Sequence, residues 1–342
     1  MTCSDIALVT DAWYPQTNGV VRTLDTVRKK LEETGRQVTV ISPEQFFTLP
    51  CPTYPEIRLS LGARRRLSIM LNRMAPRHIH IATEGPLGLA ARHYCVKRGL
   101  RFTTSFHTKF PEYLQQRTGI PPRLAYRWLR HFHAPAEAVL VPTRSMLDDL
   151  ITHGFRNGKL WTRGVDTAQF YPGDAPPLDG PAPHWLYVGR VSVEKNLPAF
   201  LALDLHGSKH VVGDGPALAK LQQQFPAVHF AGAKKGEALR QYYAASDVFV
   251  FPSRTDTFGL VMLEALACGT PIAAYPVTGP KDVITDPRVG RLDDDLAAAC
   301  HAALACKRED CIDFARLHSW ERCADIFAQT LCPSGAPQRS AA

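Results

Sequence analysis

The chain has 342 residues, of which 45% are hydrophobic and 21% are charged. This length suits two domains of ordinary size, and the composition is typical of a globular protein. No run of eighteen apolar residues occurs, and the first residues lack the basic and apolar regions of a secretory signal, so we expect neither a membrane span nor a cleaved leader. We therefore expect a cytoplasmic protein.

The nine cysteines are scattered, and none forms a Cys-x-x-Cys pair. This spacing indicates neither a zinc site nor a redox dithiol, and it fits reduced thiols in a cytosol. No other metal-binding motif stands out, so we expect no catalytic metal.

The net charge of +8 is uneven along the chain. Residues 1–170 carry 24 Lys and Arg against 13 Asp and Glu, a balance of +11, and residues 171–342 carry 16 against 19, a balance of −3. The basic excess includes Arg64-Arg65-Arg66. It suggests an anionic partner such as a membrane surface or an acidic lipid, although a solvated basic face explains it equally well. No nucleic-acid motif accompanies it, so we expect no nucleic-acid partner.

The first half alternates short apolar strands with helices. Val20, Val21, Leu24, Val27 and Leu31 fall on one face of a predicted helix that ends at Gly35. The other predicted elements of this half are strands at Ile6–Thr10, Val38–Ser42, Ile79–Ala82, Phe102–Phe106 and Ala138–Val141, and helices at Leu87–Arg98, around Arg123–His133 and after a cap at Thr143 or Ser145.

A Pro- and Gly-rich stretch, Gly173–Pro183, predicts an interdomain linker, after which the alternation restarts. The predicted strands are Trp185–Val188, Val211–Val212, Val228–Ala231, Val248–Phe251 and Pro271–Ala274, and the predicted helices are a short one after Asn196, then Ala217–Gln224, Glu237–Ala245, Phe258–Cys268 and Trp320–Leu331.

Apolar strands separated by helices predict an α/β protein whose parallel sheets are covered on both faces. We predict an N-terminal domain over residues 1–170, a C-terminal domain over residues 171–332 and a disordered tail over residues 333–342. Two such domains in tandem place a ligand crevice at the carboxyl ends of their strands.

Two segments of the N-terminal domain follow strands and are candidates for this crevice. Asn18-Gly19 opens a helix, and Gly19 lets main-chain amides approach an anion, although Asn-Gly is equally typical of a plain turn. His107, followed by Lys109, could contact a sugar hydroxyl, whereas a lone His is more often structural.

Two segments of the C-terminal domain add charge. Arg190 and Lys195 follow a strand together, and such a pair of cations can neutralise a diphosphate leaving group, although a surface loop also carries such residues. Asp256 and Glu264 flank the start of a helix whose free amides suit a phosphate and whose carboxylates suit sugar hydroxyls. The alternative for Glu264 is the solvated face of an amphipathic helix.

In combination these segments resemble the retaining glycosyltransferases of family 4, with the GT-B fold of two Rossmann-like domains facing a central cleft. The resemblance spans nearly the whole chain and favours the bacterial α-mannosyltransferase and sulfolipid-synthase branch. It implies that the C-terminal helix crosses back to the first domain. The motifs that carry it are Gly19-Val20-Val21, Phe106-His107, Arg163-Gly164-Val165-Asp166, Gly189-Arg190 with Glu194-Lys195-Asn196, Val212-Gly213-Asp214-Gly215-Pro216, and Phe251-Pro252-Ser253 through Glu264-Ala265.

The resemblance also implies roles for single residues. Arg190 and Lys195 would bind the donor diphosphate, Glu264 the nucleotide ribose, and His107 the transferred sugar. The remaining donor contacts are the amides near Phe258, Gly259 and Leu260, the approach of Gly19, and a nucleotide pocket shaped by Gly213 and Gly215.

The expected reaction is transfer of a mannose- or glucose-type hexose from a GDP- or UDP-sugar to a lipid-linked or glycan acceptor, with no cofactor. Asp256 stands where the family usually places Glu, which puts the donor preference in doubt. A sugar phosphorylase or epimerase of similar bilobal fold is one alternative, and a non-catalytic protein that binds nucleotide sugars is another.

Overall fold

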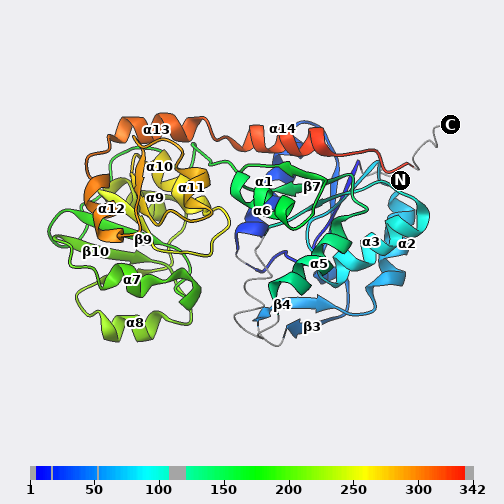
Figure 1. Ribbon diagram of the computed structural model, residues 1–342, viewed down its shortest axis with the longest axis horizontal. Helices are drawn as coiled ribbons and strands as arrows, with labels where there is room; N and C mark the ends of the chain where they lie inside the picture. Colours follow the sequence, from blue (N-terminus) through cyan, green and yellow to red (C-terminus); the bar gives the residue numbers. More distant parts are fainter. Residues whose placement is uncertain (1–4, 17, 52–53, 108–120, 336–342) are drawn as a thin grey trace. The chain divides into compact units, whose positions relative to one another are not determined.

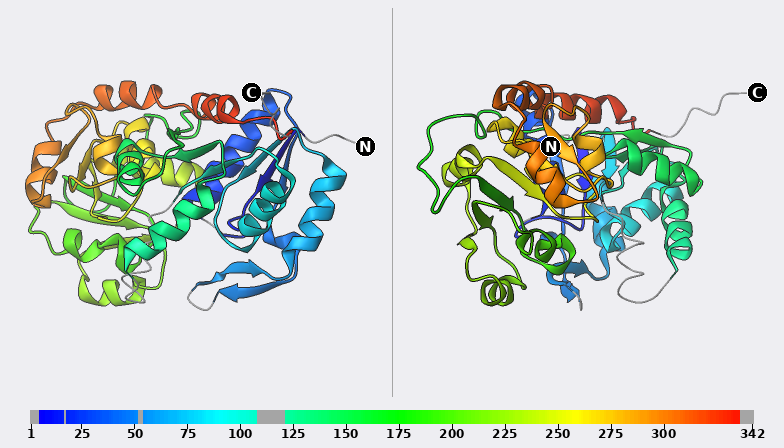
Figure 2. Two further views of the ribbon diagram at one scale, coloured as in Figure 1. Left: turned by 45° about the vertical axis from the view of Figure 1, so that its right-hand side comes forward. Right: turned by 60° about the vertical axis from the view of Figure 1, so that its left-hand side comes forward.

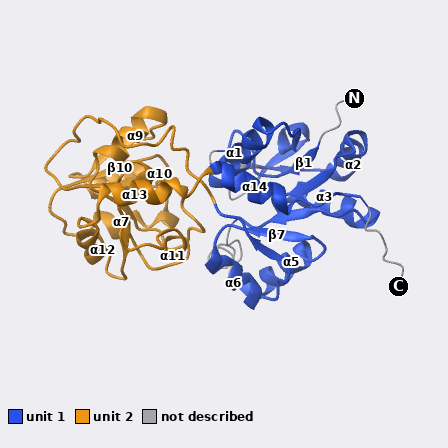
Figure 3. Cartoon of the chain, turned by 90° about the horizontal axis from the view of Figure 1, so that it is seen from above, with its two compact units in different colours: residues 1–162, 320–342 blue, residues 163–319 orange. Residues whose placement is uncertain are grey.

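The computed structural model describes residues 5–16, 18–51, 54–107 and 121–335 (Figure 1). The chain forms two compact units, drawn in two colours in Figure 3. Unit 1 comprises Met1–Thr162 together with Trp320–Ala342, and unit 2 comprises Arg163–Ser319. The chain thus enters unit 2 eight residues before the predicted boundary at 170/171, and its last helix returns to unit 1.

Unit 1 is built on a parallel six-stranded sheet in the order β2-β1-β5-β6-β7-β8. Its strands alternate with helices because each parallel strand needs a crossover to return to the same edge. The strands of this sheet are β1 (Ile6–Val9), β2 (Val38–Ile41), β5 (His78–Ile81), β6 (Thr103–Ser105), β7 (Ala138–Val141) and β8 (Gly158–Leu160). The helices are α1 (Gly19–Glu33), α2 (Ala63–Met74), α3 (Pro86–Arg98), α5 (Pro122–His133), α6 (Arg144–Thr152) and α14 (Trp320–Thr330).

Helices cover both faces of this sheet. Ala7, Val9, Ile79 and Ile81 pack with α2 and α3 in one apolar cluster. On the opposite face lie α1 and α14, which contact each other, and α14 is the red helix of Figures 1 and 2. The crossing of the C-terminal helix back to the first domain is therefore confirmed.

A two-stranded antiparallel sheet, β3 (Thr48–Cys51) and β4 (Tyr54–Ser60), precedes α2. Neither this hairpin nor α2 was predicted. In α2 the pattern is weak, because Leu67 and Leu71 are the only buried large apolar side chains in a run rich in arginine. At the other end of the chain, Ser334 donates hydrogen bonds from N and Oγ to the carbonyl oxygens of Arg77 and Pro76, at 2.7 and 2.6 Å. The predicted disorder is thus wrong at Ser334, and residues 336–342 lie outside the described part of the chain.

Unit 2 contains a second parallel sheet of six strands, in the order β11-β10-β9-β12-β13-β14. Alternate strand residues pack into two apolar clusters, one with α9 and α10 and the other with α7, α8 and α12. The strands are β9 (His184–Val188), β10 (Ser208–Val212), β11 (His229–Gly232), β12 (Val248–Phe251), β13 (Ile272–Ala274) and β14 (Gly290–Leu292). The helices are α7 (Leu197–Leu201), α8 (Leu218–Gln224), α9 (Gly236–Ala245), α10 (Leu260–Ala267), α11 (Pro280–Val283), α12 (Leu296–Ala303) and α13 (Arg308–Arg316).

Both sheets change winding direction at one point, and these points locate the ligand sites. In unit 1 the first strand β1 lies between β2 and β5, and in unit 2 the first strand β9 lies between β10 and β12. Crossovers leave such a strand in opposite directions, so the loops at its carboxyl end separate and open a crevice. The candidate residues are therefore expected in the loop after β1 in unit 1 and, separately, in the loops after β9 and β12 in unit 2.

Candidate active site

The loops after β9 and β12 meet beside the switch point of unit 2. Lys195 ends the short 3-10 helix Val193–Lys195, and its Nζ lies 2.5 Å from Oδ1 of Asp256 in the loop after β12. Both side chains are largely buried, with exposed fractions of 24% and 19%. A cation and a carboxylate from two of the predicted segments are thus in direct contact.

The second oxygen of Asp256 is the unusual atom of this pair. Oδ2 is buried and has no hydrogen-bond partner among the described residues. Buried carboxylate oxygens are costly to leave without a donor, so such an atom needs an explanation. A hydroxyl group of a bound ligand would supply the missing donor.

Side-chain donors bonded to main-chain carbonyl oxygens hold the two loops together. The Asn196 side-chain amide donates to the carbonyl oxygen of Pro252 at 3.1 Å, and the Thr255 hydroxyl donates to that of Glu194 at 3.3 Å. Asn196 adopts a left-handed conformation with φ of +55°, which Asn tolerates better than most residues. This turn directs Lys195 towards Asp256.

Arg190 leaves the end of β9 with an exposed side chain, while its main chain is fixed. The hydroxyl of Tyr187 donates to the Arg190 carbonyl oxygen at 2.9 Å. Burial, aided by the negative charges of Asp256 and Glu194, raises the pKa of Tyr187 well above its usual value, so the phenol stays a donor. A fixed backbone with an exposed guanidinium suits contact with an incoming anion.

Gly213 and Gly215 follow β10 and pack against the loop after β9. A Cβ on Gly213 would lie 1.8 Å from the carbonyl oxygen of Gly189, and one on Gly215 would lie 2.3 Å from that of Val191. The close approach of two main chains therefore explains both glycines. Their predicted role in the nucleotide pocket stays a prediction.

The predicted helix at Phe258 begins two residues later, at Leu260. Gly259 is its N-cap with φ of +84°, and a Cβ there would meet the ring of Phe251 at 2.9 Å. A left-handed residue cannot continue a helix backwards, so Phe258 lies outside it. The helix N-terminus still presents main-chain N–H groups from Leu260 onwards.

Glu264 lies inside the second turn of α10 and is only 2% exposed. Its Oε2 accepts a hydrogen bond from the Tyr243 hydroxyl at 3.0 Å. The alternative of a solvated helix face is therefore wrong for Glu264. Its predicted contact with a ribose stays a prediction.

In unit 1, the start of α1 is closed by its own cap. Oδ1 of Asn18 accepts hydrogen bonds from the amides of Val20 and Val21, each at 3.0 Å. A Cβ on Gly19 would meet no atom within 4 Å, so space is open beside this helix end. Two of the amides expected to face an anion thus already have an acceptor.

His107 stands two residues after β6, and Lys109 lies outside the described residues. The Nε2 of His107 is 2.9 Å from the Ser105 hydroxyl, and its ring meets the Trp161 indole edge-on with centroids 5.9 Å apart. The imidazole is thus held from two sides at the carboxyl edge of the sheet.

Asp11, which follows β1, was not singled out from the sequence. It is 6% exposed and caps α3, because its carboxylate accepts from the amides of Leu87 and Gly88 at 2.9 and 3.3 Å. Burial raises its pKa, and these hydrogen bonds oppose the shift. This residue shapes the loop at the switch point of unit 1.

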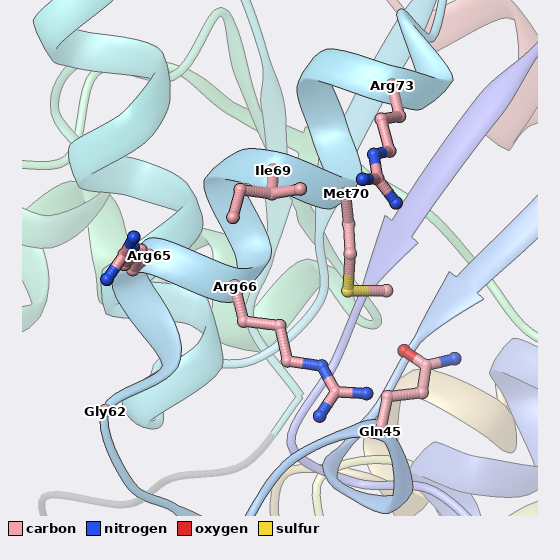
Figure 4. Close-up of a pocket in the computed structure, with 7 residues that line it drawn as sticks. All are labelled: Gln45, Gly62, Arg65, Arg66, Ile69, Met70 and Arg73. Carbon is pink, nitrogen blue, oxygen red and sulfur yellow. The ribbon is translucent and has the colours of Figure 1, made fainter.

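Two neighbouring hollows open on unit 1. The smaller, about 210 Å³, lies against the loop after β1 and is lined partly by Trp13, Tyr14 and Phe46. The larger, about 600 Å³, lies on α2, where Arg66, Met70 and Arg73 face a common space together with Gln45 (Figure 4). The Arg66 guanidinium lies 5.6 Å from the centroid of the Phe46 ring, which joins the two hollows. The remaining residues lining the larger hollow are Gly62, Arg65 and Ile69.

Comparison of the sequence with known proteins identifies the family of this chain. Residues 17–169 match the model described as Glycosyltransferase Family 4, and residues 182–307 match the one described as Glycosyl transferases group 1. A GDP-mannose-dependent alpha-mannosyltransferase of Mycobacterium tuberculosis is 31% identical, over 89% of this chain and 91% of its own length. The chain belongs to glycosyltransferase family 4.

Other relatives and structures agree with this assignment. A sulfoquinovosyl transferase of Arabidopsis thaliana is 31% identical over 76% of this glycosyltransferase and 57% of its own length. A sucrose-phosphate synthase structure from Thermosynechococcus elongatus superposes with a TM-score of 0.76 at 21% identity, covering 95% of this chain and 98% of its own. These likenesses confirm the GT-B fold of two Rossmann-like domains.

Unit 2 of the glycosyltransferase brings together most of the predicted residues of that domain. Lys195 and Asp256 are in contact, and Arg190 and Gly259 belong to the same two loops. Among the described residues no cluster of three potential metal ligands occurs, and no helix is long and apolar enough to span a membrane. Residues missed from the sequence include Asp11, whose position directly after a buried strand was the available signal.

Proposed function

We propose that this glycosyltransferase transfers mannose from GDP-mannose to a lipid-linked acceptor with retention at the anomeric carbon. The donor is supported by the names of three relatives, which state dependence on GDP-mannose. A glucose donor is the second candidate, because another relative, 26% identical over 87% of this chain, is named alpha-monoglucosyldiacylglycerol synthase.

The orphan oxygen of Asp256 is the observation that carries this proposal. Oδ1 of Asp256 contacts the Lys195 ammonium group, and the buried Oδ2 has no hydrogen-bond donor among the described residues. Asp256 and Lys195 together can therefore accept a hydrogen bond from a sugar hydroxyl and place a cation beside it. Arg190 adds a second cation from the same loop. Together they match a hexose joined to a diphosphate, which combines hydroxyl donors with negative charge.

The chemical step separates charge between an oxocarbenium-like sugar and the departing diphosphate. In the proposed route the bond from C1 to the diphosphate oxygen breaks and the acceptor oxygen bonds C1 from the same face. The acceptor proton passes to the diphosphate oxygen that has just left. Lys195, Arg190 and the amides at the start of α10 would stabilise the new negative charge, so the route uses no metal.

The basic face of α2 supports an anionic acceptor and a peripheral contact with an anionic membrane. Three arginines and two apolar side chains line its hollow, so the surface offers both charge and a contact for acyl chains. Phe47 and Leu49 follow the lining residue Gln45 in sequence, and their exposed fractions are 73% and 48%. A lipid carrying a phosphate or an acidic headgroup satisfies both features.

The test combines binding and transfer. Thermal shifts are recorded with GDP, UDP, GDP-mannose and UDP-glucose, and transfer is then assayed with lipid vesicles, the anomeric configuration of the product being read by NMR. We expect stabilisation by guanine nucleotides and an α-linked mannolipid. Stabilisation by uracil nucleotides alone would contradict the mannosyl assignment, a requirement for inorganic phosphate would indicate a phosphorylase, and binding without transfer would indicate a sensor.

A further inference from the structure

An arginine that the proposed function does not use stands in the loop after β12. The guanidinium carbon of Arg254 lies 3.6 Å from the centroid of the Tyr275 ring. Phe251, the last residue of β12, pairs with Ala274, the last residue of β13, so the residues that follow the two strands emerge side by side. Tyr275 is buried, with 6% of its surface exposed, whereas Arg254 is exposed. The ring is therefore a fixed support for an exposed cation.

The short distance fixes the orientation of the guanidinium group. An edge-on group would push its nitrogen atoms into the ring, so only a flat stack fits, and arginine stacks favourably on tyrosine in this way. In a flat stack the N–H bonds run parallel to the ring and point outwards. All residues of unit 2 are described, and no hydrogen bond or ion pair joins the Arg254 side chain to a described residue. An oriented set of donors is thus available to a ligand.

The position of Arg254 relative to the candidate residues of unit 2 follows from the strand order. The loops after β9, β12 and β13 are neighbours at one edge of the sheet. Lys195 of the first loop contacts Asp256 of the second, and a Cβ on Gly279 of the third would lie 2.8 Å from the Asp256 carbonyl oxygen. Arg254 reaches from the middle loop to Tyr275 beside β13. Its guanidinium therefore lies on the flank of Asp256 opposite to Lys195.

We propose that Arg254, held flat on Tyr275, is a specificity-determining residue that binds a phosphate or carboxylate group of the acceptor. The part concerning the acceptor rests on the proposed function. The presence of an oxyanion site at Arg254 rests only on the stacked geometry and the strand order.

The chemistry of the pair selects its ligand. A guanidinium group only donates, and two of its N–H groups match the two oxygens of a carboxylate or a phosphate. The donor diphosphate is assigned to Arg190 and Lys195 of the loop after β9, so Arg254 is left for a second anionic group. Arg98 at the end of α3 also stacks on a tyrosine, Tyr94, at 4.2 Å. The stack alone therefore does not mark a ligand site, and the place beside Asp256 does.

The first test is a titration that needs no transfer. In the ¹⁵N-arginine-labelled full chain, the Nε–H signal of Arg254 is identified as the one missing from R254K. Glycerol phosphate, glycerate or neutral glycerol is then added, first without nucleotide and then with GDP. We expect at least one of the two anions to shift the Arg254 signal under both conditions, and glycerol to leave it in place.

The same titration contains the results that would overturn the proposal. No shift with either anion, or an equal shift of the Arg98 signal, would show that no oxyanion site exists at Arg254. If GDP alone shifts the signal and abolishes the response to the anions, Arg254 belongs to the donor diphosphate and the assignment to the acceptor is wrong.

The second test separates the planar fork from simple charge. R254K keeps the positive charge but cannot form two parallel hydrogen bonds, so we expect the KM for an anionic lipid acceptor to rise about tenfold. The KM for the nucleotide sugar should change less than about twofold. R98K is the matched control, because Tyr94 is 6% exposed, as Tyr275 is. Equal changes in R254K and R98K, or a larger rise in the KM for the nucleotide sugar, would contradict the proposal.

The support is tested at Tyr275. Y275L removes the aromatic face and should raise the KM for the acceptor about as much as R254K does, whereas the conservative Y275F keeps the ring and should restore binding. A wild-type KM for the acceptor in Y275L would show that the ring does not orient the guanidinium group.

The two proposals fail differently. If no nucleotide sugar is turned over, the proposed function falls, while the titration of the Arg254 signal still decides whether an oxyanion binds there. If transfer occurs and R254K has the acceptor KM of the wild type, only the role of Arg254 is overturned.

Discussion

At Asp256 one methylene fewer than in Glu decides what the carboxylate reaches. The short side chain brings Oδ1 to Lys195 and leaves Oδ2 buried. Oδ1 thus helps to orient Lys195, and the contact of Oδ2 with a sugar hydroxyl is part of the proposed function.

Replacing Arg190 or Lys195 should weaken the stabilisation of the transition state and leave the fold intact. For Arg190→Ala and Lys195→Ala we expect kcat to fall by about 100- to 1,000-fold each, because a preorganised donor at developing charge is worth about 2.7–4 kcal/mol. Steady-state transfer assays measure this. Arg316→Ala is the control, since its side chain is 67% exposed and pairs only locally with Asp313 among the described residues. Near-normal turnover in both loop variants would remove the basis of the proposed mechanism.

Two glycines, Gly213 of unit 2 and Gly19 of unit 1, allow a comparison of stability. Gly213→Ala should lower the free energy of unfolding by about 3 kcal/mol, because the new Cβ would stand 1.8 Å from the carbonyl oxygen of Gly189 and the loops must separate. Gly19→Ala has open space and serves as the control. Urea denaturation measures both; a Gly213→Ala protein as stable as the wild type would show that the two loops do not pack as described.

At the scale of elements, the fully buried apolar strands were predicted, whereas the strands β3, β4, β8 and β14 and the helices α2, α11, α12 and α13 were not. The strands β1, β7 and β12 are fully buried apolar runs. Such runs contain no polar residue that would suggest a loop or a surface helix instead. Helix α2 was not predicted because its buried side chains are only Ala63, Leu67 and Leu71, with arginines between them. Its packing against α3 and the sheet supplies the stability that its sequence does not display.

Helix α2 should govern binding to anionic vesicles. Changing Arg65, Arg66 and Arg73 to Gln is expected to weaken binding about 100-fold, because each basic residue near such a surface contributes about 1 kcal/mol. Vesicle sedimentation at fixed salt measures this. The matched control changes Arg123, Arg127 and Arg130 of α5, which are equally exposed. A similar loss in the control would show that overall charge, not the α2 hollow, attracts the membrane.

At the scale of the whole molecule, both units carry a buried histidine that resists protonation. Burial lowers the pKa of His80 in unit 1 to about 3, and burial with the nearby His229 and His184 lowers that of His210 in unit 2 to about 4. The unfolded chain, with ordinary histidines near 6.5, therefore binds more protons than the folded one between these values. Stability is fully present above pH 6.5 and is lost as the pH falls towards 4.

Acidification from pH 7.5 to 4.5 should thus destabilise each unit by about 2 kcal/mol through its histidine. His210→Gln removes the contribution of unit 2, so this variant should lose less stability over the same interval. Urea unfolding at the two pH values provides the comparison. An equal loss in wild type and variant would show that His210 is protonated without cost in the folded state.

The sequence by itself determined the α/β class, the positions of most strands along the chain, the glycosyltransferase motifs and the loops that carry them. Alternation of buried strands and helices is a local property, and the residues after each strand end are fixed by chain order. Only the tertiary structure decided which side chains touch. The 2.5 Å contact of Lys195 with Asp256, the glycine contacts and the contact of Ser105 with His107 join residues 2 to 61 positions apart. Such contacts depend on strand order and packing, because neighbouring strands in a sheet need not be neighbours in sequence.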